Sequence, residues 1–460
     1  YNTGIGWRAL LANTTGARNT ATGMYALHSN TTGACNTASG SYSLYANTTA
    51  GFNTAHGYKA LCKNTTGANN TAVGACSLHA NVNGNGNAAI GFKAMTNTTS
   101  GVYNTATGSY SLHTNTTGSS NAAHGNVALY KNTTGANNTA SGTKSLYDNT
   151  TGCFNTAVGN NALENNTTAN FNTAVGACSL HANISGTSLV AVGYNALKSS
   201  TCANCSTAVG HQALMDQTTG GGNTAVGQAA GENVTTGVAN VIVGVKALCT
   251  ATAAHYNTAI GYQAQRQTTT GHCNSALGYN SLLSNTTGCN NVGIGLFALC
   301  LSTTGSHNTA IGTRTLAENT TGAKNVAVGY RTLCSNTSGL NNVAVGAFGL
   351  DANTTGCNNT ASGYGAMYNN ETGCNNTAMG DCALHDNTTG CHNDAFGRQA
   401  LVNNTTASYN TAIGSYSLYD NTTGAGNLAL GYAALTNNTT ACYNTAVGYA
   451  ALYDNTTGGL

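Results

Sequence analysis

The stretch Asn444–Gly458 reads NTAVGYAALYDNTTG, and it decides the fold because the chain repeats it from end to end. Counting back from Gly448 in steps of 17 residues, every step lands on a glycine as far as Gly6. Two variable residues complete the unit, so 27 units of 17 residues account for 459 of the 460 residues. A fixed period of this length is typical of repeat architectures, in which each unit contacts only its neighbours. We therefore expect residues 1–460 to form one uninterrupted tandem-repeat domain.

The composition narrows the classes of function. Charged residues make up 6% of the chain, proline is absent and the net charge is +2, so there is no basic stripe of the kind that binds nucleic acid. No run approaches the roughly 18–20 apolar residues that a membrane helix needs. The sequence shows no initiator methionine, no signal peptide and no atypical capping repeat. We expect it to be an excerpt of a longer array.

The residues around the repeated glycine favour β-structure. The residue two before the glycine is Ala in 24 of 27 units, the residue three before it is mostly Thr or Val, and the residue just before it is apolar in 20 units. The residue four after it is Leu in 23 units. Short β-prone segments separated by Asn-Thr-Thr-Gly turns predict an all-β, parallel β-solenoid (a β-roll or β-helix), with one 17-residue coil per repeat and about 27 coils. At about 4.8 Å per coil, the array would form a rod of roughly 130 Å.

Two repeated positions have a structural interpretation. A glycine in every unit predicts a tight corner, or a close backbone approach that a Cβ would block. We call these 27 residues the corner glycines. An Asn stands four residues before the corner glycine in 25 units, and stacked side-chain amides can hydrogen-bond along a stack of strands. We interpret these asparagines as structural.

The motif N-[TV]-A-[VI]-G, as in Asn325–Gly329 (NVAVG) and Asn257–Gly261 (NTAIG), resembles the head repeats of trimeric autotransporter (YadA-like) adhesins. The longer unit, with its Asn-Thr-Thr-Gly turn, also resembles repeats of tail-fibre-like proteins from phages and bacteria. The resemblance covers the whole array and rests on a short motif of common residues. It implies a left-handed parallel β-roll in a homotrimer, and a shaft that binds receptors or glycans. The adhesin head unit is shorter, so each coil here needs an additional turn or side.

The Asn-Thr-Thr-Gly turn supplies the main candidate site. In 19 units the Asn seven residues after the corner glycine begins an N-x-[ST] sequon, which in an extracellular eukaryotic protein predicts N-glycans on surface turns. Four units keep Thr-Thr-Gly but have Gln217, Val234, Thr268 or Ser302 in place of that Asn, so the alternative is that the turn is kept for its own conformation. The candidate acceptors are Asn13, Asn30, Asn47, Asn64, Asn115, Asn132, Asn149, Asn166, Asn183, Asn285, Asn319, Asn336, Asn353, Asn370, Asn387, Asn404, Asn421, Asn438 and Asn455.

Aromatic residues accompany these sequons. Side chains two residues apart in an extended segment point to the same side, so a Tyr two residues before the Asn could pack against the first sugar. Other variable positions are also rich in Tyr, which suits lateral association or adhesion to glycans, or else covers the surface of the coils. The tyrosines beside sequons are Tyr45, Tyr130, Tyr147, Tyr368, Tyr419 and Tyr453.

The 17 cysteines are scattered over several repeat positions. Cys357, Cys374 and Cys391 share one position in consecutive units, so we expect them to stack, at a spacing of about 4.8 Å that lies within the Cα range of disulfides. Cys202 and Cys205 form a C-x-x-C motif without a second pair of ligands. The sequence therefore predicts no metal site there.

The remaining patterns give no sign of catalysis. His28, His79, His113, His181 and His385 share one variable position without repeated acidic partners, and no nucleophile or phosphate-binding constellation accompanies them. We predict no enzyme, no catalytic residues and no cofactor. Thr recurs at three positions per unit, as ice-binding faces require, but Tyr, His, Lys and Glu occupy the neighbouring positions.

Together these features predict a structural protein outside the cell or on the surface of a cell or virion. It would be a β-solenoid rod of a fibre or filament, with copies of itself as partners and with covalent or surface glycans as further partners. Nucleic acid and a membrane span are not expected. The alternatives are a receptor- or glycan-binding shaft of a tail fibre or trimeric adhesin and, less favoured by the sequence, an ice-binding protein.

Overall fold

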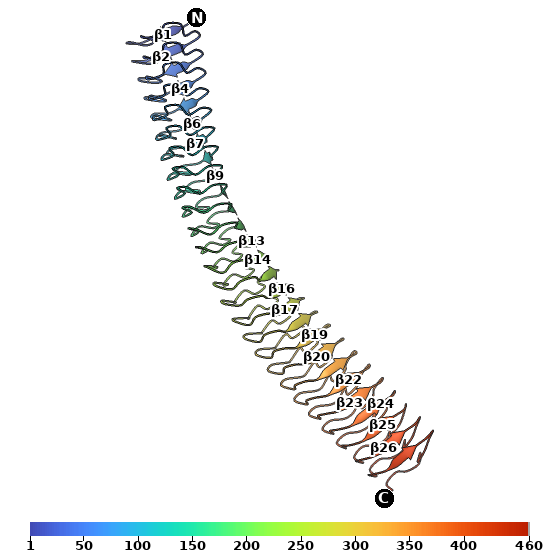
Figure 1. Ribbon diagram of the computed structural model, residues 1–460. Coiled ribbons are helices and arrows are strands. Elements are labelled where there is room, and N and C mark those ends of the chain that lie inside the picture. The colour runs from blue at the N-terminus through green and yellow to red at the C-terminus, as the bar shows by residue number, and fades with distance from the viewer. Residues whose placement is uncertain (459–460) are drawn as a thin grey trace. The chain divides into compact units, whose positions relative to one another are not determined.

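A computed structural model describes residues 1–458, and the chain divides into two compact units, Tyr1–Ala229 and Ala230–Leu460. Each unit is a parallel β-solenoid in which every 17-residue repeat forms one coil with one strand (Figure 1). All strands have three residues, and the described residues contain no helix. The predicted fold class is therefore confirmed.

The strands occur at the same place in every repeat. Those of the first unit are β1 (Thr3–Ile5), β2 (Thr20–Thr22), β3 (Thr37–Ser39), β4 (Thr54–His56), β5 (Thr71–Val73), β6 (Ala88–Ile90), β7 (Thr105–Thr107), β8 (Ala122–His124), β9 (Thr139–Ser141), β10 (Thr156–Val158), β11 (Thr173–Val175), β12 (Val190–Val192), β13 (Thr207–Val209) and β14 (Thr224–Val226). Those of the second are β15 (Val241–Val243), β16 (Thr258–Ile260), β17 (Ser275–Leu277), β18 (Val292–Ile294), β19 (Thr309–Ile311), β20 (Val326–Val328), β21 (Val343–Val345), β22 (Thr360–Ser362), β23 (Thr377–Met379), β24 (Asp394–Phe396), β25 (Thr411–Ile413), β26 (Leu428–Leu430) and β27 (Thr445–Val447).

Within each unit every strand pairs in parallel with the next, in the register of the repeat. Thr156 of β10 pairs with Thr173 of β11, for example, and Ala157 pairs with Ala174. The remainder of the coil is also bonded to its neighbour, since the N–H of Leu146 donates to the carbonyl of Ala162 at 3.0 Å. Each coil is thus held to the next on both its strand side and its turn side.

The core of each coil is thin. The middle residue of a strand, such as Ala157, points inward and is fully buried, while the first and third residues face outward. The Leu four residues after the corner glycine, such as Leu146, is also fully buried. One small and one large aliphatic side chain therefore account for most of the apolar interior of a coil.

The corner glycines behave as the sequence predicts. Gly125 has a φ of +137°, and a Cβ at this position would lie 2.6 Å from the carbonyl oxygen of Gly142 in the next coil. Both the backbone conformation and the close approach therefore require glycine.

The sequence does not indicate the conformation of the buried leucines. Leu146 has a φ of +50°, in the left-handed region that branched side chains rarely adopt. In the same repeat Lys144 and Phe154 have φ values of +57° and +59°. Left-handed residues at fixed positions in every coil turn the chain sharply, so the 14 residues between consecutive three-residue strands close into a narrow loop.

Candidate functional surfaces

The asparagines four residues before the corner glycines lie inside the coils, and we call them the strand-side asparagines. The Oδ1 of Asn138 accepts the backbone N–H of Asn155 in the next coil at 3.0 Å. Its Nδ2 donates to the carbonyl oxygen of Gly152, in the turn of the same repeat, at 2.8 Å. The same two bonds recur one coil later: Oδ1 of Asn155 accepts the backbone N–H of Asn172, and its Nδ2 donates to the carbonyl oxygen of Ala169. As predicted, these side chains link consecutive coils.

The sequon asparagines also lie inside, and we call them the turn-side asparagines. Of the 19 candidates, 17 are fully buried, while Asn13 and Asn455, in the first and last coils, are half-buried. Asn149 is representative: its Nδ2 donates to the carbonyl of Gly152 at 3.0 Å and to Oδ1 of Asn132 at 2.8 Å. The expected position on surface turns is therefore wrong, because both amide hydrogens bond within the interior. Glycosylation itself stays a prediction, and it would have to precede the folding of the coil.

The six tyrosines beside the sequons do not lie next to the sequon amides. The ring of Tyr130 stacks between those of His113 and Tyr147, with both centroid distances 5.2 Å. The sequence predicts Tyr147 and Asn149 on the same side of an extended segment. Residues 143–148 instead form a turn, so this expectation is wrong. The rings form outward columns along the stack, while the amides point inward.

These aromatic columns border shallow hollows in the second unit. One hollow of about 560 Å³ is lined by Tyr416, Tyr419 and Tyr432 together with Asp420 and Asn437, among others. Its rings pack at centroid distances of 5.8 Å, between Tyr416 and Tyr419 and between Tyr416 and Tyr432. Aromatic rings thus lie beside a carboxylate and an amide group in this hollow. A smaller hollow of about 260 Å³ is lined by Phe348, Tyr364, Gly365, Tyr368 and His385.

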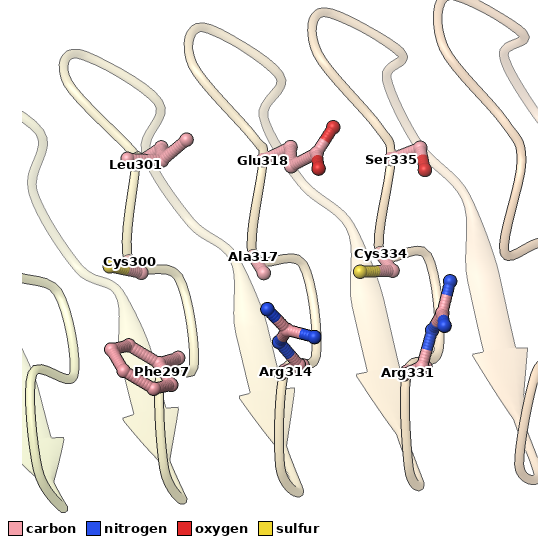
Figure 2. Close-up of a pocket in the computed structure, with 9 residues that line it drawn as sticks. All are labelled: Phe297, Cys300, Leu301, Arg314, Ala317, Glu318, Arg331, Cys334 and Ser335. Carbon is pink, nitrogen blue, oxygen red and sulfur yellow. The ribbon is translucent and has the colours of Figure 1, made fainter.

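A third hollow, of about 290 Å³, contains charged residues from consecutive coils (Figure 2). Arg314 and Arg331 lie in one row with Phe297, and Glu318 lies two rows above them, beyond the row that contains Ala317. Arg331 is bound by Asp351, with Nη2 and Oδ2 3.0 Å apart. Burial raises the pKa of the Asp351 carboxyl, and the Arg331 charge opposes that rise. Much of the positive charge of this hollow is therefore already neutralised.

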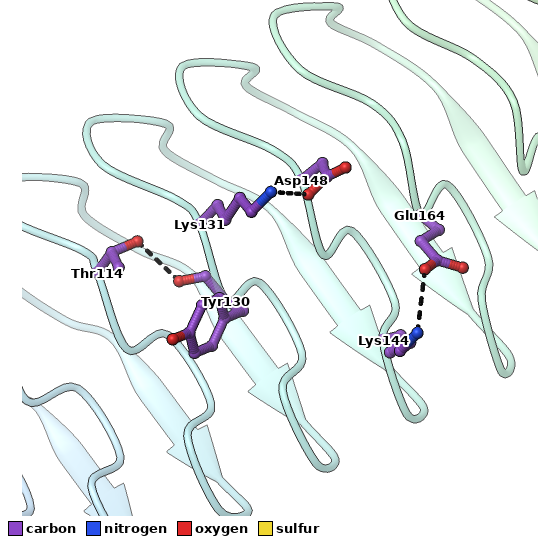
Figure 3. Close-up of polar contacts among 6 residues, drawn as sticks. All are labelled: Thr114, Tyr130, Lys131, Lys144, Asp148 and Glu164. Atoms are coloured by element: carbon purple, nitrogen blue, oxygen red, sulfur yellow. Dashed lines mark hydrogen bonds and ion pairs between the residues drawn. The ribbon is translucent and has the colours of Figure 1, made fainter.

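Other charges pair between neighbouring coils in the first unit (Figure 3). Lys131 Nζ lies 2.7 Å from Asp148 Oδ1, and Lys144 Nζ lies 3.4 Å from Glu164 Oε1. The side chains of both lysines are about half exposed, so each pair contributes roughly 0–1 kcal/mol to stability. These two ion pairs link neighbouring coils at the surface.

The predicted histidine and cysteine positions also lie in columns. Burial lowers the pKa of the His79 and His113 imidazoles, which favours their neutral forms. In the cysteine column the Sγ of Cys374 accepts the N–H of Cys357, and the Sγ of Cys391 accepts the N–H of Cys374, both at 3.1 Å. All 17 cysteines are free thiols. Among the described residues, no three His, Cys, Asp or Glu side chains are placed to hold a metal ion.

The outward residues of the strands form a further surface, which we call the strand face: the first and third residues of every strand. The third residue is apolar in 12 of the 13 strands of the second unit. In the first unit it is apolar in 8 of the 14 strands. Leu277 is 47% exposed and Val345 is 45% exposed, whereas Ile260 and Ile294 are half-buried. In the sequence these apolar residues indicate strand propensity and give no sign of their exposure. The buried Ala between them is the signal that they face outward. The apolar third residues of the second unit are Val243, Ile260, Leu277, Ile294, Ile311, Val328, Val345, Met379, Phe396, Ile413, Leu430 and Val447.

The described residues include no helix long and apolar enough to cross a membrane. No known protein-family model matches the chain, and no curated protein matches it. The likeness to adhesin heads and tail fibres therefore rests on the repeat motif alone, and what the structure shows is a tandem-repeat, parallel β-solenoid.

Proposed function

We propose that this protein is a structural component of an extracellular fibre or surface filament, in which the β-solenoid serves as a stiff spacer and associates with copies of itself. The observation that carries the proposal is the interior of the coils. Two columns of buried asparagine amides run along the stack beside backbone hydrogen bonds from each coil to the next. Hydrogen bonds from most coils to the next resist bending, and further repeats can be added to the stack in the same way.

Electron microscopy and fibre diffraction of the purified chain test this proposal. The expected result is elongated particles or filaments with a repeat of about 4.8 Å along the long axis, because each coil adds one strand spacing. Dispersed compact particles under all conditions, with no such reflection, would argue against it.

Intact-mass analysis of native material tests the glycan prediction separately. An unmodified chain has a mass of 46.1 kDa. A higher mass, with sugars mapped to Asn149 and its equivalents, would mean that glycans are added before the coils close. An unmodified mass would assign these asparagines to the interior alone.

A second candidate function is the binding of surface glycans, which the hollow around Tyr416 supports. Tyr432 is 48% exposed and stands beside the Asp420 and Asn437 side chains in this hollow. Tyr432→Ala should then weaken binding of a soluble oligosaccharide, measured by calorimetry. Tyr42→Ala, in the first unit, is the control and should leave binding unchanged. Equal binding by both variants would exclude this hollow as the site.

A further inference from the structure

We propose that the strand face of the second unit is the surface through which two copies of this chain associate, strand face against strand face. The inference rests on the proposed function and deepens it, because it assigns self-association to one surface. The surface consists of the first and third residues of β15–β27.

The strand face of the second unit is continuous and almost uncharged. From Val243 to Val345, seven consecutive strands have a Val, Ile or Leu at the third position. Asp394 is the one charged residue among the first and third positions of β15–β27. Parallel sheets are normally covered on both faces, and exposed apolar patches of this kind mark interaction sites. The inner face of this sheet is covered by the coil, whereas the outer face consists of exposed and half-buried side chains.

The area of this surface suits a specific interface. Thirteen strands at about 4.8 Å extend over roughly 60 Å, and two side-chain columns give a width of about 12 Å. The resulting area of roughly 700 Å² per copy is close to the roughly 800 Å² per partner of a standard protein–protein interface. A partner would have to be equally long and flat to cover it.

The spacing of the side chains identifies that partner as a second copy. The backbone bonds between coils fix one apolar row at every strand, so a partner must offer rows with the same repeat to fit along the whole length. The same strand face of another copy has that repeat at every coil, and sheets pack face to face at about 10 Å. Thr258 and Thr309 stand at first positions among the aliphatic rows, where their hydroxyls can bond to Thr of the other copy.

Other occupants fit this surface less well. The hollows around Phe297, Phe348 and Tyr416 are lined by residues of the turns and not of the strand face. With a single charge on the strand face, there is little to select an oppositely charged partner. A lipid surface shares the apolar chemistry, and the experiment distinguishes it.

Sedimentation equilibrium of the full chain tests the proposal with a matched pair of double variants. Leu277→Lys with Ile311→Lys places two charges at third positions two strands apart in the second unit. Thr107→Lys with Ser141→Lys places the same charges at equivalent positions in the first unit. Wild type and the first-unit variant should sediment as a complex of at least two 46.1 kDa chains. The second-unit variant should associate at least about 100-fold more weakly, because pairing would bury its charges.

A second variant guards against misfolding. Leu277→Thr with Ile311→Thr copies the polar third positions of the first unit and places a β-branched side chain, which favours strands, at both positions, so it should retain the wild-type circular dichroism and still associate more weakly. Equal weakening by the first-unit and second-unit lysine variants would overturn the proposal. Binding of wild type to neutral phosphatidylcholine vesicles, without self-association, would overturn it in favour of lipid.

The same samples separate the two proposals. If wild type and the second-unit lysine variant both form filaments, the proposed function stands and the assigned surface is wrong. If wild type neither associates nor forms filaments, the proposed function fails as well.

Discussion

The strand-side and turn-side asparagines are two columns of buried amides inside the same coils, yet the repeat retains them to different degrees. Asn occupies the strand-side position in 25 of 27 repeats and the turn-side position in 20. Asn138 accepts the backbone N–H of Asn155, for which no second acceptor is present. Asn149 donates to the carbonyl of Gly152, which also accepts from Asn138. Its other hydrogen bond goes to a side chain, that of Asn132. A buried amide is therefore needed most where it is the one partner of a backbone group.

The chain itself contains two exceptions at the strand-side position, and one of them, Ser206, still accepts the backbone N–H of the next coil, that of Asn223, at 3.2 Å. Leu189 and Ser206 replace strand-side asparagines in consecutive coils. There Gln217 takes the turn-side position, donating to Ser206 Oγ at 3.1 Å and accepting from Asn223 at 3.0 Å. The longer side chain of Gln217, at a turn-side position, thus bonds to Ser206, which lacks the amide of a strand-side asparagine.

The largest effect is expected for Asn138→Ala. The substitution leaves the buried N–H of Asn155 without an acceptor, so the free energy of local opening should fall by about 2–3 kcal/mol. Hydrogen exchange of the amides of β9 and β10 measures this, because unfolding of a repeat array is local and not two-state. Asn138→Ser is the control, since Ser206 Oγ accepts the N–H of Asn223 at 3.2 Å. An equal loss for both variants would contradict the explanation.

A smaller effect is expected for Asn149→Val, which copies Val234, a fully buried residue at the same position. No backbone group loses its last partner, although Oδ1 of Asn132 loses its donor from Asn149. The chain tolerates that arrangement elsewhere, since Oδ1 of Asn285 has no partner. The opening free energy should fall by about 1 kcal/mol, measured by the same exchange experiment. A loss as large as that of Asn138→Ala would remove the distinction between the columns.

Gln265→Leu should act in the opposite direction. Gln265 is fully buried where most repeats have Leu, and its Oε1 has no hydrogen-bond partner. Replacing it removes an unsatisfied buried acceptor and restores the apolar core, so we expect a gain of about 1 kcal/mol in the local opening free energy measured by hydrogen exchange. Leu248→Gln, one coil earlier, is the reverse substitution and should lose stability. A loss in both variants would mean that the amide nitrogen of Gln265 matters more than its oxygen.

The smallest effect is expected for Thr133→Val. Its Oγ1 donates to the carbonyl of Thr150 at 3.0 Å, but the N–H groups of Thr133, Thr134 and Gly135 also donate to that oxygen. Val82 occupies the same position in another coil. We expect a change of at most about 0.5 kcal/mol in the opening free energy by hydrogen exchange. A change above that of Asn149→Val would show that the outer hydroxyl column is a main support of the turn.

Much of the fold could be predicted because it is a consequence of the period. An unbroken step of 17 residues, a corner glycine and a Thr-Ala-Val segment in each repeat are sufficient to predict parallel strands in register, one per coil. The strand-side asparagines could be predicted as structural for the same reason. Identical residues at a fixed spacing must stack, whatever the path of the chain between them.

Tertiary structure alone decided which way the side chains point between the strands. The sequence places Asn149 on a surface turn beside Tyr147, but the closed coil turns the amide inward and the ring outward. That outcome depends on Leu146 in a left-handed conformation, which no propensity of Leu indicates. It is held by bonds to residues 16 or 17 positions away, as in the pairing of Leu146 with Ala162. Local sequence therefore determined the period and the strands. The contacts between successive coils determined which asparagines are buried and which apolar residues remain exposed, because only the closed coil separates an interior from a surface.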